Sequence, residues 1–149
     1  SNDVELEFDF EKVTEKSKEN PVFYIQYAFA RINSIFSSLK FEVEDSIDIN
    51  KNDFKLNSYE IDILKKISEW PKCVELSLNR LEPHRINFYL YELVTLFHAY
   101  WNLGNSRKEF RFISDDNKFV VSRLVLLQAL AIVIKNGMKI LGISTPKSM

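Results

Sequence analysis

The chain has 149 residues, of which 46% are hydrophobic and 28% charged, with three glycines and a formal net charge of −1. This length and composition predict one ordered, globular and mostly helical domain, spanning residues 1–149, that buries a core. The near-neutral charge argues against a protein that coats nucleic acid through positive charge alone, and the longest apolar run, residues 124–134, is too short to span a bilayer.

The first long helix is predicted to begin at residue 20, after an acidic lead-in segment at residues 1–19 that contains a short helix. Asn20 is a favourable N-cap, and Pro21 loses no hydrogen bond in the first turn. The helix is expected to reach about Lys40. Its core-facing residues recur at helical spacing: Ile25, Ala28, Ile32, Phe36 and Leu39.

The acidic residues 41–57 predict a loop. Ser58 is then expected to cap a helix that runs to about Trp70. Pro71 breaks this helix or restarts it as a second segment, which ends near Leu81.

Pro83 is expected to open a long helix, and Gly104 to stop it before a basic loop at residues 105–115. The apolar face of this helix consists of Ile86, Leu90, Leu93, Phe97 and Trp101.

The last long helix is predicted to use Asp115 or Asp116 as its cap. Its residues are apolar on nearly every face, which is typical of the buried centre of a bundle. Asn136 and Gly137 are expected to interrupt it before a short last turn that ends at Gly142. With no strand pattern after residue 10, the predicted fold class is all-α, a helical bundle at residues 20–149.

Charge is distributed unevenly along the chain. Residues 1–20 carry seven acidic residues against three lysines, whereas residues 103–149 carry eight Lys and Arg residues against three acids. A basic C-terminal third can face phosphate groups, but a solvated surface with this much charge is also ordinary. The charge pattern alone leaves both interpretations open.

No catalytic or metal-binding pattern is visible in the sequence. Neither His84 nor His98 lies at metal-ligand spacing from Cys73, and no glycine-rich phosphate loop is present. We therefore expect no metal and no cofactor in this chain. The single cysteine excludes an intramolecular disulfide and is typical of a reducing, cytoplasmic compartment.

Tyr24, Tyr27 and Arg31 form the best candidate for a binding surface. Their spacing of i, i+3 and i+7 puts them on one helix face, about 100° away from the core-facing residues. Aromatic rings and guanidinium planes of this kind bind unpaired RNA bases by stacking. Alternatively, the two tyrosines pack against a neighbouring helix.

Two motifs at opposite ends of the chain carry a family resemblance. The first reads Asn20-Pro-Val-Phe-Tyr-Ile-Gln-Tyr-Ala-Phe-Ala-Arg31, and the second reads Asn136-Gly-Met-Lys-Ile-Leu-Gly-Ile-Ser-Thr-Pro-Lys-Ser-Met149. Both resemble the C-terminal anticodon-binding (DALR) domain of bacterial-type arginyl-tRNA synthetases, which are class I enzymes. The chain departs from the family pattern at Phe29, where histidine is usual, and at Lys147 and Ser148, where Glu-Arg is usual.

The resemblance implies roles for particular residues. Tyr24, Tyr27 and Arg31 match positions implicated in anticodon binding, and Met149 matches a terminal methionine that approaches the anticodon loop. Trp101 lies at the family's aromatic position on the facing helix, although its place on the apolar face also fits a packing role. Arg111 and Arg123 either contact tRNA phosphates or pair with Asp115 and Asp116. The implied tRNA-binding residues are thus Tyr24, Tyr27, Arg31, Trp101, Arg111, Arg123 and Met149.

The resemblance also implies a function. The parent enzyme would join arginine to its tRNA with ATP and Mg²⁺ in a catalytic domain outside this chain, since the class I signatures His-x-Gly-His and Lys-Met-Ser-Lys are absent here. The expected partners are the anticodon loop of an arginine tRNA and the enzyme's own catalytic domain, in a monomer without membrane contact. Every arginine anticodon has a cytosine in the middle, so this base is the natural one to check. The alternatives are a helical protein–protein interaction domain and the anticodon domain of another class I synthetase, such as a cysteinyl or glycyl type.

Overall fold

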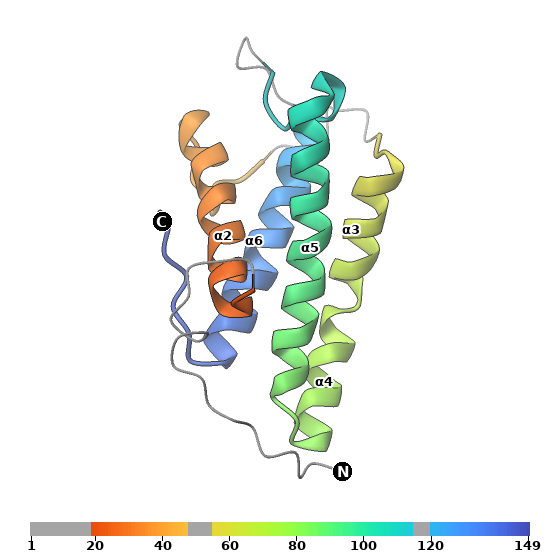
Figure 1. Cartoon of the computed structure of the whole chain (residues 1–149), viewed down its shortest axis with the longest axis vertical. Coiled ribbons are helices and arrows are strands. Elements are labelled where there is room, and N and C mark those ends of the chain that lie inside the picture. Colours follow the sequence, from red (N-terminus) through yellow and green to blue (C-terminus); the bar gives the residue numbers. More distant parts are fainter. Residues whose placement is uncertain (1–18, 48–54, 115–119) are drawn as a thin grey trace.

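The computed structural model describes residues 19–47, 55–114 and 120–149. The regular elements in these ranges are all helices, which lie side by side in a bundle (Figure 1). This confirms the predicted all-α fold. The lead-in segment, apart from Glu19, and its short helix lie outside the described residues. The helices are α2 (Pro21–Ser38), α3 (Ser58–Ser68), α4 (Trp70–Arg80), α5 (His84–Ser106), the short 3₁₀ helix η1 (Lys108–Phe110) and α6 (Val121–Ile140).

Two asparagines define the starts of α2 and α3. The side chain of Asn20 accepts hydrogen bonds from two backbone N–H groups in the first turn of α2, as predicted. For α3 the cap is Asn57 rather than the predicted Ser58. Asn57 Oδ1 accepts from the N–H of Glu60 at 3.0 Å, while a Glu60 carboxylate oxygen accepts from the N–H of Asn57 at 2.8 Å. This reciprocal capping box displaces the start by one residue, because it satisfies two backbone donors together.

Both predicted proline starts are close to the observed boundaries. Pro71 lies in the first turn of α4, so the break after α3 is a restart. α5 follows Pro83 directly. Gly104, however, does not stop α5, which continues to Ser106. A Cβ at Gly104 would lie only 3.2 Å from the carbonyl oxygen of Phe110, so this glycine serves the close approach of the following segment.

The prediction for α6 was wrong in two details. Asp115 and Asp116, the expected caps, lie outside the described residues, and α6 begins only at Val121 without a side-chain cap. Asn136 and Gly137 do not interrupt the helix. Gly137 instead permits contact with α5, since an added Cβ would lie 2.8 Å from Leu90 Cδ1. The predicted end is correct: Gly142 follows α6 with a φ of 71°.

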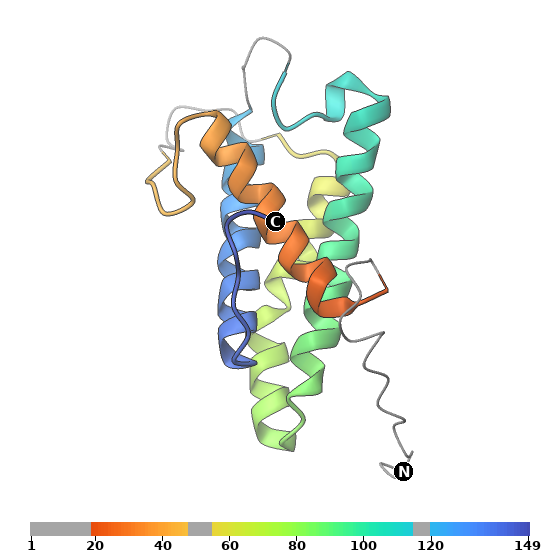
Figure 2. The ribbon, with the colours of Figure 1, turned by 60° about the vertical axis from the view of Figure 1, so that its left-hand side comes forward.

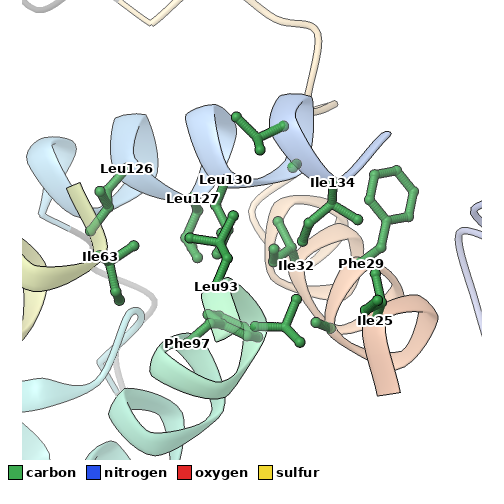
Figure 3. Close-up of a cluster of buried hydrophobic side chains, with 14 of the residues drawn as sticks. Ile25, Phe29, Ile32, Ile63, Leu93, Phe97, Leu126, Leu127, Leu130 and Ile134 are labelled. Atoms are coloured by element: carbon green, nitrogen blue, oxygen red, sulfur yellow. The ribbon is translucent and has the colours of Figure 1, made fainter. Parts of the chain in front are cut away.

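The core fills the space between α2, α3, α5 and α6 (Figure 3). Ile25 and Ile32 of α2 belong to one buried cluster with Leu93 and Phe97 of α5 and with leucines of α6, which confirms the predicted apolar faces. The helix that contacts all the others is α5, not α6. In α6, Leu124 is 1% exposed but Ile132 is 49% exposed, so one face of this helix meets solvent.

α6 is long and apolar enough to cross a membrane when judged by length and composition alone. More than half of its apolar stretch is nevertheless buried against the other helices. This is the pattern of a core helix in a helical bundle.

Candidate functional site

Tyr24 lies mainly between α2 and α5. Its ring centroid is 4.3 Å from that of His98 and 5.5 Å from that of Tyr91. Burial raises the pKa of the Tyr24 phenol; Tyr91 raises it further, and Arg31 opposes the change. Among Tyr24, Tyr27 and Arg31, Tyr24 is therefore the residue that best fits the alternative in which the tyrosines pack against a neighbouring helix.

Tyr27 and Arg31 contact each other at the surface of α2. Tyr27 is 37% exposed, and the Arg31 guanidinium lies over its ring, with Cζ 4.4 Å from the centroid. Arg31 Nη2 also donates a hydrogen bond to the Tyr27 hydroxyl at 2.5 Å. A cation over an aromatic ring gains about 0.5–2 kcal/mol, depending on how dry the contact is. The two side chains thus form one preassembled unit on the surface of α2.

Trp101 brings α5 into this unit. Arg31 Cζ lies 4.6 Å from the Trp101 ring centroid, so the guanidinium contacts two aromatic side chains. The other contacts of Trp101 are with Phe97 and, in a nearly parallel arrangement, with Phe112 at 6.1 Å. Trp101 therefore supports the core and also borders the surface. This position is compatible with both the packing role and the binding role considered for it from the sequence.

The C-terminal tail completes a hollow beside Arg31. After α6 the chain turns at Gly142 and runs back beside α2 (Figure 2). Gln26 Nε2 donates to the carbonyl oxygen of Ser144 at 2.8 Å, and Lys147 Nζ donates to the Glu42 carboxylate at 2.9 Å.

The resulting hollow, here called the α2–tail cleft, has a volume of about 310 Å³. It combines aromatic, cationic and apolar groups from both ends of the described chain. Its lining consists of Tyr27, Ala30, Arg31, Ser34, Trp101, Lys147, Ser148 and Met149. Four of the seven predicted site residues, namely Tyr27, Arg31, Trp101 and Met149, thus meet in one place, and Tyr24 lies just behind them.

His98 belongs to the same cluster, although it was not among the residues predicted for the site. The residue is 4% exposed, its Nδ1 lies 3.3 Å from Arg31 Nη1, and its Nε2 lies 3.5 Å from the carbonyl oxygen of Tyr24. Burial lowers the pKa of His98 to about 4; the Tyr24 carbonyl opposes this shift and the Arg31 charge reinforces it. A sequence signal existed: His98 precedes Trp101 by three residues and so shares its helix face.

Arg111 and Arg123 do not join the α2–tail cleft. Arg123 Nε donates to Glu60 Oε1 at 2.7 Å, and its other two nitrogens donate to the carbonyl oxygens of Arg111 and Glu109. Arg111 Nε donates to the carbonyl oxygen of Gly104 at 3.2 Å. The acidic partners suggested for these two arginines, Asp115 and Asp116, lie outside the described residues. A contact of either arginine with tRNA phosphate stays a prediction.

The buried partner of Arg123 ties three helices together. Glu60 of α3 is 1% exposed and also accepts a hydrogen bond from the Tyr100 hydroxyl of α5 at 2.5 Å. Burial is the main reason that the pKa of the Tyr100 phenol is raised. The network supports the segment around Phe110 and Phe112, and these two side chains line a second hollow, of about 220 Å³, that shares Trp101 with the cleft.

No group of three or more His, Cys, Asp or Glu side chains able to hold a metal occurs within residues 19–47, 55–114 and 120–149. Cys73 lies partly buried between α4 and α5, and burial raises the pKa of its thiol. His84 lies at the start of α5, with its ring against Phe88. These residues therefore remain outside the candidate site.

The bundle and the α2–tail cleft define a helical binding domain. Comparison with known proteins agrees, and the chain belongs to the DALR anticodon binding domain family, whose model matches residues 25–149.

Two similar proteins are named arginine–tRNA ligase. The protein from Pelagibacter ubique is 50% identical over 149 residues, covering 100% of this chain and 26% of that protein. The protein from Roseobacter denitrificans is 42% identical over 152 residues, covering 99% of this chain and 26% of that protein. The chain thus spans about a quarter of the length of these relatives.

A solved structure shares the fold. A crystal structure from Campylobacter jejuni, named as that of a putative arginyl tRNA synthetase, matches with a TM-score of 0.77 and 24% sequence identity, covering 99% of this chain and 30% of that chain. At this identity the likeness supports the fold alone.

Proposed function

We propose that this chain binds the anticodon loop of an arginine tRNA, as the anticodon-binding part of an arginine–tRNA ligase. The observation that carries the proposal is the α2–tail cleft, where Tyr27 and Arg31 from one motif meet Met149 from the other. Membership of the DALR family and the names of the two relatives support the same function.

The relatives are about four times as long as this chain, which leaves room for a separate catalytic domain. In this proposal the longer protein attaches arginine to tRNA, with ATP and Mg²⁺ bound in that domain. The present chain contributes tRNA binding and identity and performs no chemical step. It takes part as a domain of a monomeric, cytoplasmic enzyme that does not enter a membrane.

The side chains of the cleft suit an unpaired base. Stacking of a base on an aromatic side chain contributes about 1–3 kcal/mol and does not depend on sequence. Sequence is read at the edges of unpaired bases, by hydrogen bonds. The guanidinium of Arg31 has five N–H donors, of which two are used in the hydrogen bonds to Tyr27 and His98. The others suit the carbonyl oxygen and ring nitrogen of cytosine, the middle base of every arginine anticodon.

The test is a binding titration of the chain with RNA hairpins whose loop carries an arginine anticodon. We expect a loop with cytosine in the middle to bind at least about fivefold more tightly than one with uracil, because leaving a polar group unpaired costs about 1 kcal/mol or more. Binding should weaken with added salt, because phosphate contacts release counterions. Equal affinity for both loops and for duplex DNA would contradict the proposal.

A protein–protein interaction domain is the second candidate. The exposed Leu78, Leu81 and Phe88 favour it, since they lie on α4, after α4 and on α5, away from the cleft. In a longer enzyme the same residues suit contact with another domain, so both functions can coexist on different faces. Substitution of Phe88 separates them, because the proposal expects no effect of this residue on RNA binding.

A further inference from the structure

Three side chains hold the guanidinium of Arg31. Tyr27 and Trp101 contact it through their rings, and His98 contacts it through a ring nitrogen. The two ring contacts fix its distance from α2 and α5. Two directional hydrogen bonds, from Nη2 to the Tyr27 hydroxyl and from Nη1 to His98, fix its rotation and so set which N–H groups of Arg31 remain for a ligand.

The protonation state of His98 follows from its two partners. A guanidinium only donates hydrogen bonds, so Nδ1, which lies 3.3 Å from Arg31 Nη1, has to be the acceptor. A neutral imidazole then carries its hydrogen on Nε2, which lies 3.5 Å from the Tyr24 carbonyl oxygen. The two contacts therefore require the same neutral tautomer.

We propose that His98 is a positioning residue for RNA binding, which orients the Arg31 guanidinium in the α2–tail cleft as a neutral hydrogen-bond acceptor without touching RNA itself. This inference rests on the proposed function of the cleft. Because His98 is 4% exposed, it acts through Arg31. Within the described residues, the N–H groups of Arg31 other than those directed at Tyr27 and His98 have no hydrogen-bond partner. These groups face the acceptor atoms of the RNA.

Protonation of His98 would reverse its contact with Arg31. The acceptor at Nδ1 would become a donor, and an imidazolium would lie against a guanidinium, so the two like charges would repel each other. The ionisable groups that contact His98 in the described residues are Tyr24, Tyr27 and Arg31 from α2, and Tyr91 of its own helix lies against Tyr24. No carboxylate is among these groups to stabilise the charged form.

The test compares two amide substitutions of similar size. Asparagine Oδ1 lies as many bonds from Cα as histidine Nδ1 and can accept from Arg31. The amide group of glutamine reaches the position of Nε2, next to the Tyr24 carbonyl, and leaves Arg31 without an acceptor. We expect His98→Gln to weaken binding of the anticodon hairpin by about tenfold, and His98→Asn to recover most of that loss. Thermal unfolding of both variants checks that they are folded at the temperature of the titration.

The pH dependence gives an independent readout. Hairpin binding by the wild-type chain should fall more steeply below pH 5 than binding by His98→Asn, while titration of the RNA bases affects both equally. Long-range ¹H–¹⁵N NMR spectra of the free chain at neutral pH should show His98 as the neutral Nε2–H tautomer.

The failure of this inference is distinguishable from failure of the proposed function. Equal affinities of the Asn and Gln variants, parallel pH profiles, or an Nδ1–H or charged His98 at neutral pH would overturn the role of His98 while RNA binding by the wild type stands. Absence of hairpin binding by the wild-type chain would instead overturn the proposed function, and the role of His98 with it.

Discussion

Gln26 and Ser144 are separated by 118 residues but are joined by one hydrogen bond, from the side-chain amide of Gln26 to the carbonyl oxygen of Ser144 at 2.8 Å. This bond ties the tail to α2 two residues after the turn at Gly142. It fixes the direction of the tail, so that Met149 reaches the cleft beside Arg31. The contribution of the C-terminus to the site therefore depends on a residue that itself lies outside the lining.

The first prediction tests this link with Gln26→Met, which keeps the length of the side chain and removes the donor. We expect the tail to loosen, with NMR order parameters at Ser148 and Met149 falling below about 0.6. Hairpin affinity should fall severalfold, whereas stability should change by no more than about 1 kcal/mol, because the bond is exposed. Met149→Ala is the control, since it removes the cleft residue but leaves the link. An unchanged order parameter at Met149 would show that other contacts hold the tail.

The second prediction concerns the buried pair of Glu60 and Arg123. Their 2.7 Å contact lies between α3 and α6, and Arg123→Met leaves the Glu60 carboxylate without this cation. Removing one partner of a buried ion pair costs about 3–5 kcal/mol, which urea unfolding can measure. Glu60→Gln combined with Arg123→Met should cost less than the sum of the single changes. A loss below 1 kcal/mol for Arg123→Met would indicate that the pair contributes little.

The third prediction compares a buried position of α6, Leu124, with a half-exposed one, Ile132. Leu124→Asp places a carboxylate in the core and should abolish cooperative unfolding at ordinary temperatures, because a buried unpaired charge is strongly unfavourable. Ile132→Asp is the matched control on the same helix, and its half-exposed position should limit the loss to about 1 kcal/mol. Circular dichroism melting of both variants tests the contrast. Similar melting curves would mean that the two faces of α6 are not distinguished as described.

The fold could be predicted well from the sequence because the spacing of apolar residues and the residues that start helices are local signals. Asn20 and Pro21 mark the start of α2 without reference to the rest of the chain. The errors at Gly104 and Gly137 have a tertiary cause. Gly104 allows the backbone of Phe110 to approach α5, and Gly137 allows the side chain of Leu90 to approach α6. Neither glycine is needed to end a helix. Local sequence does not distinguish these two uses of glycine.

The site was predictable only in part. Tyr27, Arg31 and Met149 were found through the two motifs, but their meeting in one cleft depends on the turn at Gly142 and the return path of the tail. His98 was not among the predicted site residues, because its spacing fits no metal-binding pattern and neither motif contains it. Its contact with Arg31 arises between α2 and α5, which sequence spacing alone does not bring together.

The fourth prediction follows from the pKa of His98, which burial lowers from 6.5 to about 4 in the folded chain. The unfolded state binds the proton more readily, so the contribution of His98 to stability is fully present above pH 6.5. It is lost as the pH falls towards 4 and below. The unfolding free energy should therefore drop more between pH 7 and about pH 4.5 in the wild type than in His98→Asn, in which the carboxylates still titrate. Parallel drops would contradict the shifted pKa.

The most direct test of the central claim combines stability and base discrimination in Tyr27→Ala. Hairpins with cytosine or uracil at the middle anticodon position are titrated against the wild type, Tyr27→Ala and Phe88→Ala, whose 62% exposed ring lies away from the cleft. Tyr27→Ala is predicted to lose about 1–3 kcal/mol of binding to the cytosine loop and little thermal stability. It should also lose most of its preference for cytosine, because the Tyr27 ring and hydroxyl hold the Arg31 guanidinium that reads the base edge. Phe88→Ala should bind as the wild type does. A Tyr27→Ala protein that melts at a much lower temperature but still prefers cytosine as strongly as the wild type would contradict the claim that this cleft reads the anticodon.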